Sequence, residues 1–251
     1  MTHPSNPDYG NGTFRRRIRL VNKGNQVSVE LEDCNHGFRL IIHHHNNCIN
    51  AIDVETLRFP LSTCPGAIKP LQALIGCGLA DGITTFKLAS PPRSNCTHLY
   101  DLALLAVNHA KRNEVERIYD VEVPDSITAQ QSMSVFRNGE KIHHWQTDQQ
   151  RIAIPSPLDG KPLMQGFSNW SKQHFKDAEL LEAAQVLQRG YFVARARRVE
   201  LNSRGGEPAI NDTMMIGACY SYSLGVVEQA LRLPSTVRDF SNSPDQLLTF
   251  Q

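Results

Sequence analysis

The spacing of the apolar residues changes abruptly near Pro65, and this change limits the folds that are open to the chain. Before it, the stretch NQVSVELEDC places Val27, Val29 and Leu31 on one face, an alternation that is typical of a strand. Two further runs, GFRLIIHHH and CINAIDVETL, are rich in β-branched residues and are separated by a turn. Residues 14–57 are therefore expected to form an antiparallel meander.

Two helices are expected after this change. Pro65 opens a run of helical spacing that Gly76 ends, and proline is favoured at the first position of a helix. The loop ASPPRSN then leads into a second helix, from Thr97 to about Arg112. Its apolar face consists of Leu99, Leu102, Leu105 and Ala106.

The second half of the chain repeats this mixture of hairpins and helices. The dipeptide in RNGE, between two alternating runs, predicts a tight β-hairpin. Helices are expected across SNWSKQHF, with Ser168 as cap, and across DAELLEAAQVLQRG, with Asp177 as cap and Gly190 as stop. YFVARARRVEL then resembles a strand, MIGACYSYS an extended segment and GVVEQALRL a short helix.

These elements predict an α+β fold, because strands and helices are segregated along the chain rather than alternating. We expect antiparallel meanders covered by helices, arranged in two closely packed units. The expected divisions are a flexible leader at 1–13, an N-terminal α+β unit at 14–120, a C-terminal α+β unit at 121–241 and a tail at 242–251.

The composition bounds the location and the partners of the protein. A formal charge of +1 gives no electrostatic reason to expect nucleic acid as a partner, and no apolar stretch approaches the roughly 20 residues that cross a bilayer. The N-terminal stretch MTHPSNPDYGNGTF is polar, so it does not resemble a signal peptide, and the six cysteines are typical of reduced thiols. We expect a soluble cytoplasmic protein with a small-molecule substrate, and homo-oligomer formation stays open.

Two cysteines lie at expected helix starts. Cys64 directly precedes Pro65, where unpaired backbone N–H groups and the helix dipole would lower the pKa of the thiol and favour the thiolate. The alternative is a small buried side chain at a strand-to-helix corner, since free cysteine is often buried. Cys96 has the same placement, one residue ahead of Thr97.

His98 and Asp101 follow Cys96 and lie three residues apart, hence on one face of a helix. A thiol, an imidazole and a carboxylate that converge at a helix start can ligate a metal or form a thiol–imidazole pair. The alternative is that both are ordinary polar residues of a first helical turn. Asp33 and His36 lie in a turn between two strands, where Asx hydrogen bonding explains the aspartate, yet His36 could point into the same cleft.

The blocks RFPLSTCPGAIKPLQALIG and NCTHLYDLALLAVNHA together resemble the bacterial domain-of-unknown-function family 2889. Later stretches, FRNGEKIHHWQ, LQRGYFVARAR, GACYSYS and STVRDF, extend the resemblance over roughly residues 14–241. The family implies no established activity, only that the two cysteine blocks belong together. The first half is also similar to iron–sulfur scaffold proteins of the NifU and SufE type, which use three cysteines plus an Asp or His. Here Cys64 and Cys96 match in placement, and Asp33–His36 would replace the first cysteine.

We expect an enzyme of organic-acid or aromatic catabolism, a lyase, isomerase or hydrolase, because the chain has no nucleotide-binding motif and no charged or low-complexity arm. A thiolate or His98 would be the base or nucleophile, Asp101 would orient His98, and Arg58 would hold a substrate carboxylate. The alternative is an accessory protein that binds Zn or Fe; a third is a structural protein without a site. The candidate catalytic or metal-binding residues are Cys64, Cys96, His98 and Asp101, and the candidate substrate-binding residues are Arg58, Asp33, His36, Trp145 and Cys219.

Overall fold

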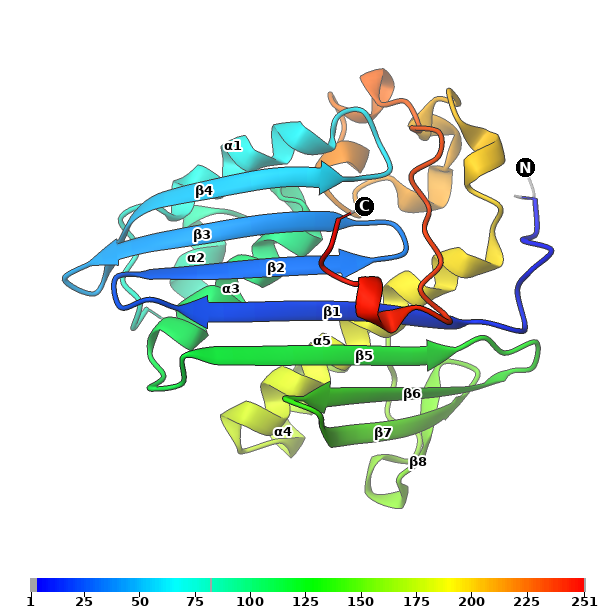
Figure 1. Ribbon diagram of the computed structural model, residues 1–251, viewed down its shortest axis with the longest axis horizontal. Coiled ribbons are helices and arrows are strands. Elements are labelled where there is room, and N and C mark those ends of the chain that lie inside the picture. The colour runs from blue at the N-terminus through cyan, green and yellow to red at the C-terminus, as the bar shows by residue number, and fades with distance from the viewer. Residues whose placement is uncertain (1–3, 82, 251) are drawn as a thin grey trace.

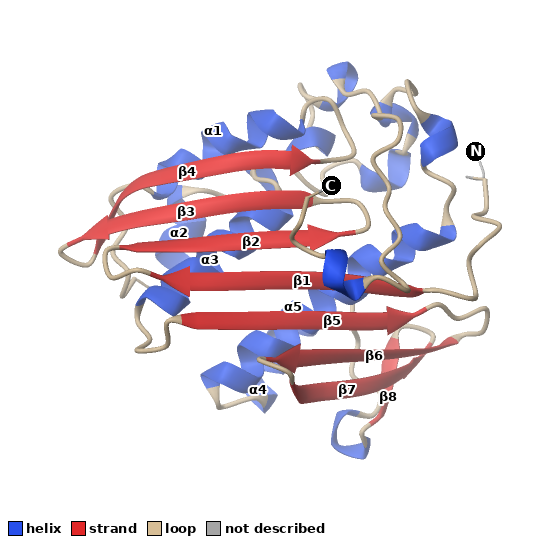
Figure 2. Cartoon of the chain, viewed as in Figure 1, coloured by secondary structure: helices blue, strands red, loops and turns tan. Residues whose placement is uncertain are grey.

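One antiparallel sheet of eight strands forms the centre of the computed structural model, which describes residues 4–81 and 83–250 (Figure 1). The α-helices lie behind this sheet in the view of Figure 2, so the fold is α+β, as expected. The strands are β1 (Thr13–Asn22), β2 (Gln26–Asp33), β3 (Gly37–His45), β4 (Cys48–Arg58), β5 (Glu116–Pro124), β6 (Gln130–Arg137), β7 (Glu140–Asp148) and β8 (Arg151–Ile154). The α-helices are α1 (Ile68–Leu71), α2 (Ile83–Ala89), α3 (Thr97–Ala110), α4 (Phe167–His174) and α5 (Ala178–Ala194).

The two halves of the sheet repeat one topology. The strand order is β4-β3-β2-β1-β5-β6-β7-β8, so each half is a four-stranded meander that starts at the centre, and a long helix follows each meander. Helix α3 packs on β1, β2 and β3, while α5 packs mainly on β5, β6 and β7. The central strands β1 and β5 pair from Thr13–Pro124 to Val21–Glu116. The expected division at residues 120 and 121 therefore falls inside β5, and the sheet continues across it.

Strand β1 shows why this sheet has one buried face. Its residues alternate strictly, so Phe14, Ile18 and Leu20 face the helices and are buried. Arg17 and its neighbours on the other face form ion pairs across the sheet, for example with Asp120 at 2.7 Å. Arg16 breaks the pattern, because it lies on the face of the apolar residues and is itself buried.

Helix α5 differs from the expectation at its C-terminal end. Asp177 caps its start, as predicted, by accepting hydrogen bonds from the backbone N–H groups of Glu179 and Leu180. Gly190 does not end it: the helix runs on to Ala194 and into a 3-10 turn, so the strand expected there is wrong. A Cβ at Gly190 would lie 2.5 Å from a methyl group of Val121, so this glycine allows the helix to approach the sheet.

Helix α4 and the segment beyond residue 198 also differ from what the sequence predicts. Helix α4 begins at Phe167 after Gly166, so Ser168 is not its cap. The predicted hairpin is confirmed, with Asn138 and Gly139 both at positive φ between β6 and β7. Beyond residue 198 the described chain contains short 3-10 turns in place of the expected extended segment and short helix.

Both ends of the described part of the chain pack against the rest of the molecule. Ser5 bridges to Val199, within the stretch expected as a leader. At the other end, residues 242–250 lie in front of the sheet in Figure 1. There the backbone N–H groups of Leu248 and Phe250 donate hydrogen bonds to Glu32.

Candidate functional site

The turn between β2 and β3 holds the first part of the candidate site. Asp33 ends β2, and its Oδ1 accepts hydrogen bonds from the backbone N–H groups of Asn35 at 2.8 Å and His36 at 2.9 Å. This is the Asx arrangement expected from the sequence. The same oxygen lies 3.1 Å from Nδ1 of His36. The turn therefore fixes the carboxylate and the imidazole as one hydrogen-bonded pair.

Arg16 supports this pair from the neighbouring strand. It is the cross-strand partner of Asp33 in the β1–β2 register, and its Nε donates to Asp33 Oδ2 at 2.9 Å. Both side chains are almost fully enclosed, with 3% and 0% exposed. Burial alone would raise the pKa of Asp33, but Arg16 and His36 outweigh it and hold the pKa well below its usual value. Asp33 is therefore a carboxylate at neutral pH.

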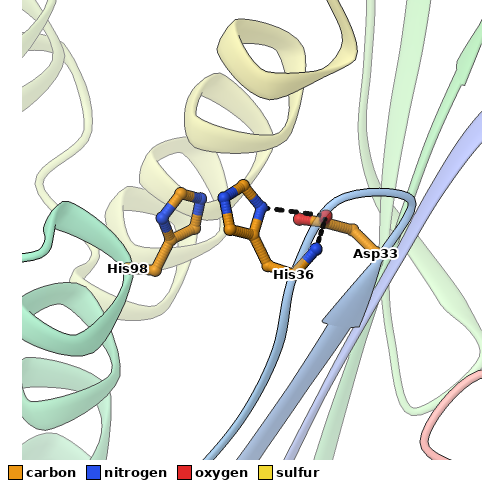
Figure 3. Close-up of side chains that lie close together, drawn as sticks. All are labelled: Asp33, His36 and His98. Carbon is orange, nitrogen blue, oxygen red and sulfur yellow. Dashed lines mark hydrogen bonds and ion pairs between the residues drawn. The ribbon is translucent and has the colours of Figure 1, made fainter. Parts of the chain in front are cut away.

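His98, in the first turn of α3, lies against His36. The two ring centroids are 3.9 Å apart with 31° between the ring planes. Figure 3 shows the ring of His36 between Asp33 and His98. Burial, followed by the neighbouring His36 and Arg16, lowers the pKa of His98 well below its usual value, so this imidazole is neutral at pH 7. Its Nε2 is buried without a hydrogen-bond partner, an arrangement that is costly for a polar atom.

Of the predicted thiols, Cys96 lies beside this cluster, and burial disfavours the thiolate at both Cys96 and Cys64. Cys96 Sγ is 3.9 Å from Nδ1 of His98, and burial raises the pKa of the Cys96 thiol. Cys64 receives a hydrogen bond from Ser221 Oγ at 3.4 Å, and burial raises its pKa to about 11. The prediction of a lowered pKa at Cys64 is therefore wrong. The 3-10 turn that Cys64 begins has four residues, and burial outweighs what so short a turn can contribute.

Cys219 does lie near the other two thiols. Both Cys64 and Cys219 add to the raised pKa of Cys96, so the three thiols lie near one another. Cys64 and Cys219 also pack against a small apolar cluster that is separate from the main core. Trp145 is elsewhere: it lies on β7, in the main core, with its ring near those of His143 and Phe167. The structure therefore does not place Trp145 beside Cys219.

Asp101 and Arg58 have roles other than those expected. Asp101 forms an ion pair with Arg189 of α5, with 2.8 Å between Oδ2 and Nε, and the structure shows no hydrogen bond from it to His98. Burial raises the pKa of Asp101, and Arg189 partly opposes this. Arg58 donates to the backbone carbonyl groups of Asp33 and Cys34 at 2.7 and 2.9 Å and to a Glu32 carboxylate. Its guanidinium therefore braces the β2–β3 turn instead of facing a substrate.

One group of three metal-ligand side chains is found among the described residues. It consists of Asp33, His36 and His98, whose ligand-type atoms all lie within 4.8 Å of one another. The set expected from the sequence, Cys64, Cys96, His98 and Asp101, does not form such a group in that part of the chain. The oxygens of Asp33 already accept hydrogen bonds from Arg16, Asn35 and His36, so the atoms left to coordinate a metal are imidazole nitrogens.

Two residues of this region were not identified from the sequence. Arg16 is part of the run RRRIR, which was interpreted as the start of a strand with a solvated face. The alternation itself contained the signal, because residue 16 shares the face of Phe14 and Ile18. Arg189 lies in the middle of a helix, and only its contact with Asp101 distinguishes it from other surface arginines.

Comparison with known proteins adds no family to these observations: no family model matches the chain, and no curated protein shows significant similarity to it. The resemblance to family 2889 therefore stays a prediction. Within the described residues, the structure contains no helix that is both long and apolar enough to span a bilayer.

Proposed function

We propose that this chain is a cytoplasmic enzyme of small-molecule catabolism, in which His36 acts as the general base and acid. The observation that supports the proposal is the hydrogen bond between Asp33 and Nδ1 of His36, with Arg16 holding the carboxylate ionised. A carboxylate on Nδ1 fixes the tautomer that carries its proton there and leaves Nε2 with a lone pair. His36 keeps 12% of its side chain exposed, so it is the member of the pair that a small molecule can approach.

The chemistry follows from this arrangement. Nε2 of His36 takes a proton from a substrate, and the Asp33 carboxylate stabilises the imidazolium that forms. Delivery of this proton to another atom of the substrate completes an isomerisation, and delivery to a leaving group completes an elimination. In a hydrolysis, Nε2 takes the proton from the attacking water and passes it to the leaving group. His98 is a neutral neighbour, whose ring can accept or donate a hydrogen bond without adding a second positive charge. The substrate class is a small organic acid or aromatic compound.

A panel of small organic acids and aromatic compounds, followed by NMR spectroscopy for conversion, tests the proposal. His36→Gln is expected to lower turnover by about 10²–10⁴-fold, the usual contribution of a general base, while the variant melts near the parent. The matched control is His43→Gln, because His43 also pairs with an aspartate, Asp53, at 2.8 Å, but on the exposed part of β3. If the parent converts no compound, or if both variants keep parental turnover, the proposal fails.

A metal-binding protein is the second candidate, since the ligand atoms of Asp33, His36 and His98 lie so close together and Nε2 of His98 has no partner. Under this candidate the imidazoles of His36 and His98 bind Zn or Fe, and the hydrogen bond from Nδ1 of His36 to Asp33 orients the His36 ring. Elemental analysis of protein purified without added metal decides. Stoichiometric Zn or Fe that is lost in both His36→Gln and His98→Gln supports the metal candidate, and a metal-free parent that does not take up Zn²⁺ excludes it.

A further inference from the structure

An ion pair with Asp101 places Arg189 near the imidazoles of His36 and His98. It lies on the exposed side of α5, and its Nε donates to Asp101, which is three residues after His98 on α3. Residues three apart on a helix are neighbours on its surface. The ion pair therefore holds the guanidinium one helical turn from the imidazole of His98.

The exposed fraction of the side chains increases from Asp33 towards Arg189. The side chain of Asp33 is fully enclosed, that of His36 is 12% exposed, that of Asp101 is 29% exposed and that of Arg189 is 51% exposed. A molecule that reaches the imidazoles from the side of Arg189 thus meets the guanidinium first.

We propose that Arg189 binds the carboxylate group of an organic-anion substrate, a role that rests on the enzyme function proposed above. Asp101 occupies Nε of Arg189, and the structure shows no other partner for this guanidinium within the described chain. The two Nη groups are therefore available for a charge-assisted, bidentate contact with a carboxylate. Asp101 is a positioning residue in this arrangement, because it orients the arginine and does not touch the substrate.

Titration of the whole chain with benzoate and malonate, with benzamide and malonamide as neutral counterparts, tests this role by NMR spectroscopy of the histidine ring signals. The parent is expected to bind the carboxylates more tightly than the amides. Arg189→Gln is expected to weaken carboxylate binding about tenfold or more and to leave amide binding unchanged, since a hydrogen bond to a charged group accounts for at least that factor. Arg189→Lys is expected to recover part of the loss, and Asp101→Asn to weaken carboxylate binding by a smaller factor.

The matched control is Arg195→Gln, because Arg195 is an exposed arginine at the C-cap of the same helix, with Met164 as its hydrogen-bond partner. It is expected to bind both carboxylates like the parent. The role is refuted if the parent does not distinguish benzoate from benzamide, or if Arg189→Gln binds both carboxylates as the parent does. The two proposals fail separately. If carboxylate binding depends on Arg189 but His36→Gln keeps parental turnover, only the general-base role of His36 is refuted. If Arg189→Gln leaves the KM of a converted substrate unchanged, only the carboxylate-binding role of Arg189 is refuted.

Discussion

Replacing Asp33 by asparagine is expected to destabilise the fold more than any exposed charge replacement in the sheet. Asparagine keeps an oxygen for the backbone N–H groups of the turn, so the change mainly removes the charge that faces Arg16. Breaking a buried ion pair costs about 3–5 kcal/mol, because the remaining charge is left uncompensated. For a chain of this size, that is a fall in Tm of roughly 6–20 °C.

The control is another cross-strand Arg–Asp pair whose arginine also lies in β1. Arg17 and Asp120 also bridge neighbouring strands, at 2.7 Å, but their side chains are 29% and 26% exposed. Asp120→Asn is therefore expected to cost about 1 kcal/mol or less in a urea titration followed by tryptophan fluorescence.

A double variant completes the measurement. Arg16→Met with Asp33→Asn removes both charges, so its destabilisation is expected to be at least about 1 kcal/mol smaller than the sum of the two single variants. Additivity within about 0.5 kcal/mol, or a cost of Asp33→Asn below about 1 kcal/mol, would refute the view that a buried charge pair supports the site.

Three further outcomes follow from the structure. His98 has a pKa below its unfolded value of 6.5, so the unfolded chain gains a proton first as the pH falls. The free energy of unfolding should therefore decrease as the pH is lowered from 6.5. His98→Gln should reduce the slope of this decrease by up to about 1.4 kcal/mol per pH unit in urea titrations. Iodoacetamide at pH 8 should alkylate the exposed Cys48 long before Cys64 and Cys96, as read by peptide mass spectrometry, and equal rates would restore the thiolate interpretation. Limited proteolysis should not cut within Tyr119–Glu122 until the chain unfolds globally, because β5 is paired there with β1 on one side and β6 on the other. An early cut within this stretch would mean two independent units.

The secondary structure that could be predicted is the part that local rules determine. The meander over β1 to β4, the Asn138–Gly139 hairpin and the Asp177 cap each depend on alternation, turn chemistry or capping, which neighbouring residues specify. Gly190 shows where these rules end. A glycine near the end of an apolar run predicts a stop, but here it accommodates the side chain of Val121 from β5, a contact that exists only after the helix packs on the sheet.

The same limit explains which parts of the site were predicted. That Cys64 and Cys96 belong to one region followed from their matched positions before helical runs, and the structure places them near one another. Whether a cysteine at a helix start is a thiolate depends on two opposing effects, the helix dipole and burial, and only the first can be estimated from sequence. Burial wins at both residues, and at Cys64 it outweighs the hydrogen bond from Ser221, which by itself lowers the pKa.

Asp33 and His36 were recognised as a turn, and the turn is what makes them a candidate acid–base pair. The hydrogen bonds that satisfy the β2–β3 backbone also set the distance of 3.1 Å between the carboxylate and the imidazole. An Asx turn alone is a structural feature, and many surface turns have one. Here a buried arginine on the neighbouring strand and an imidazole from α3 enclose it, and neither belongs to the turn. The chemistry of this site therefore depends on how β1 and α3 pack around an ordinary local motif.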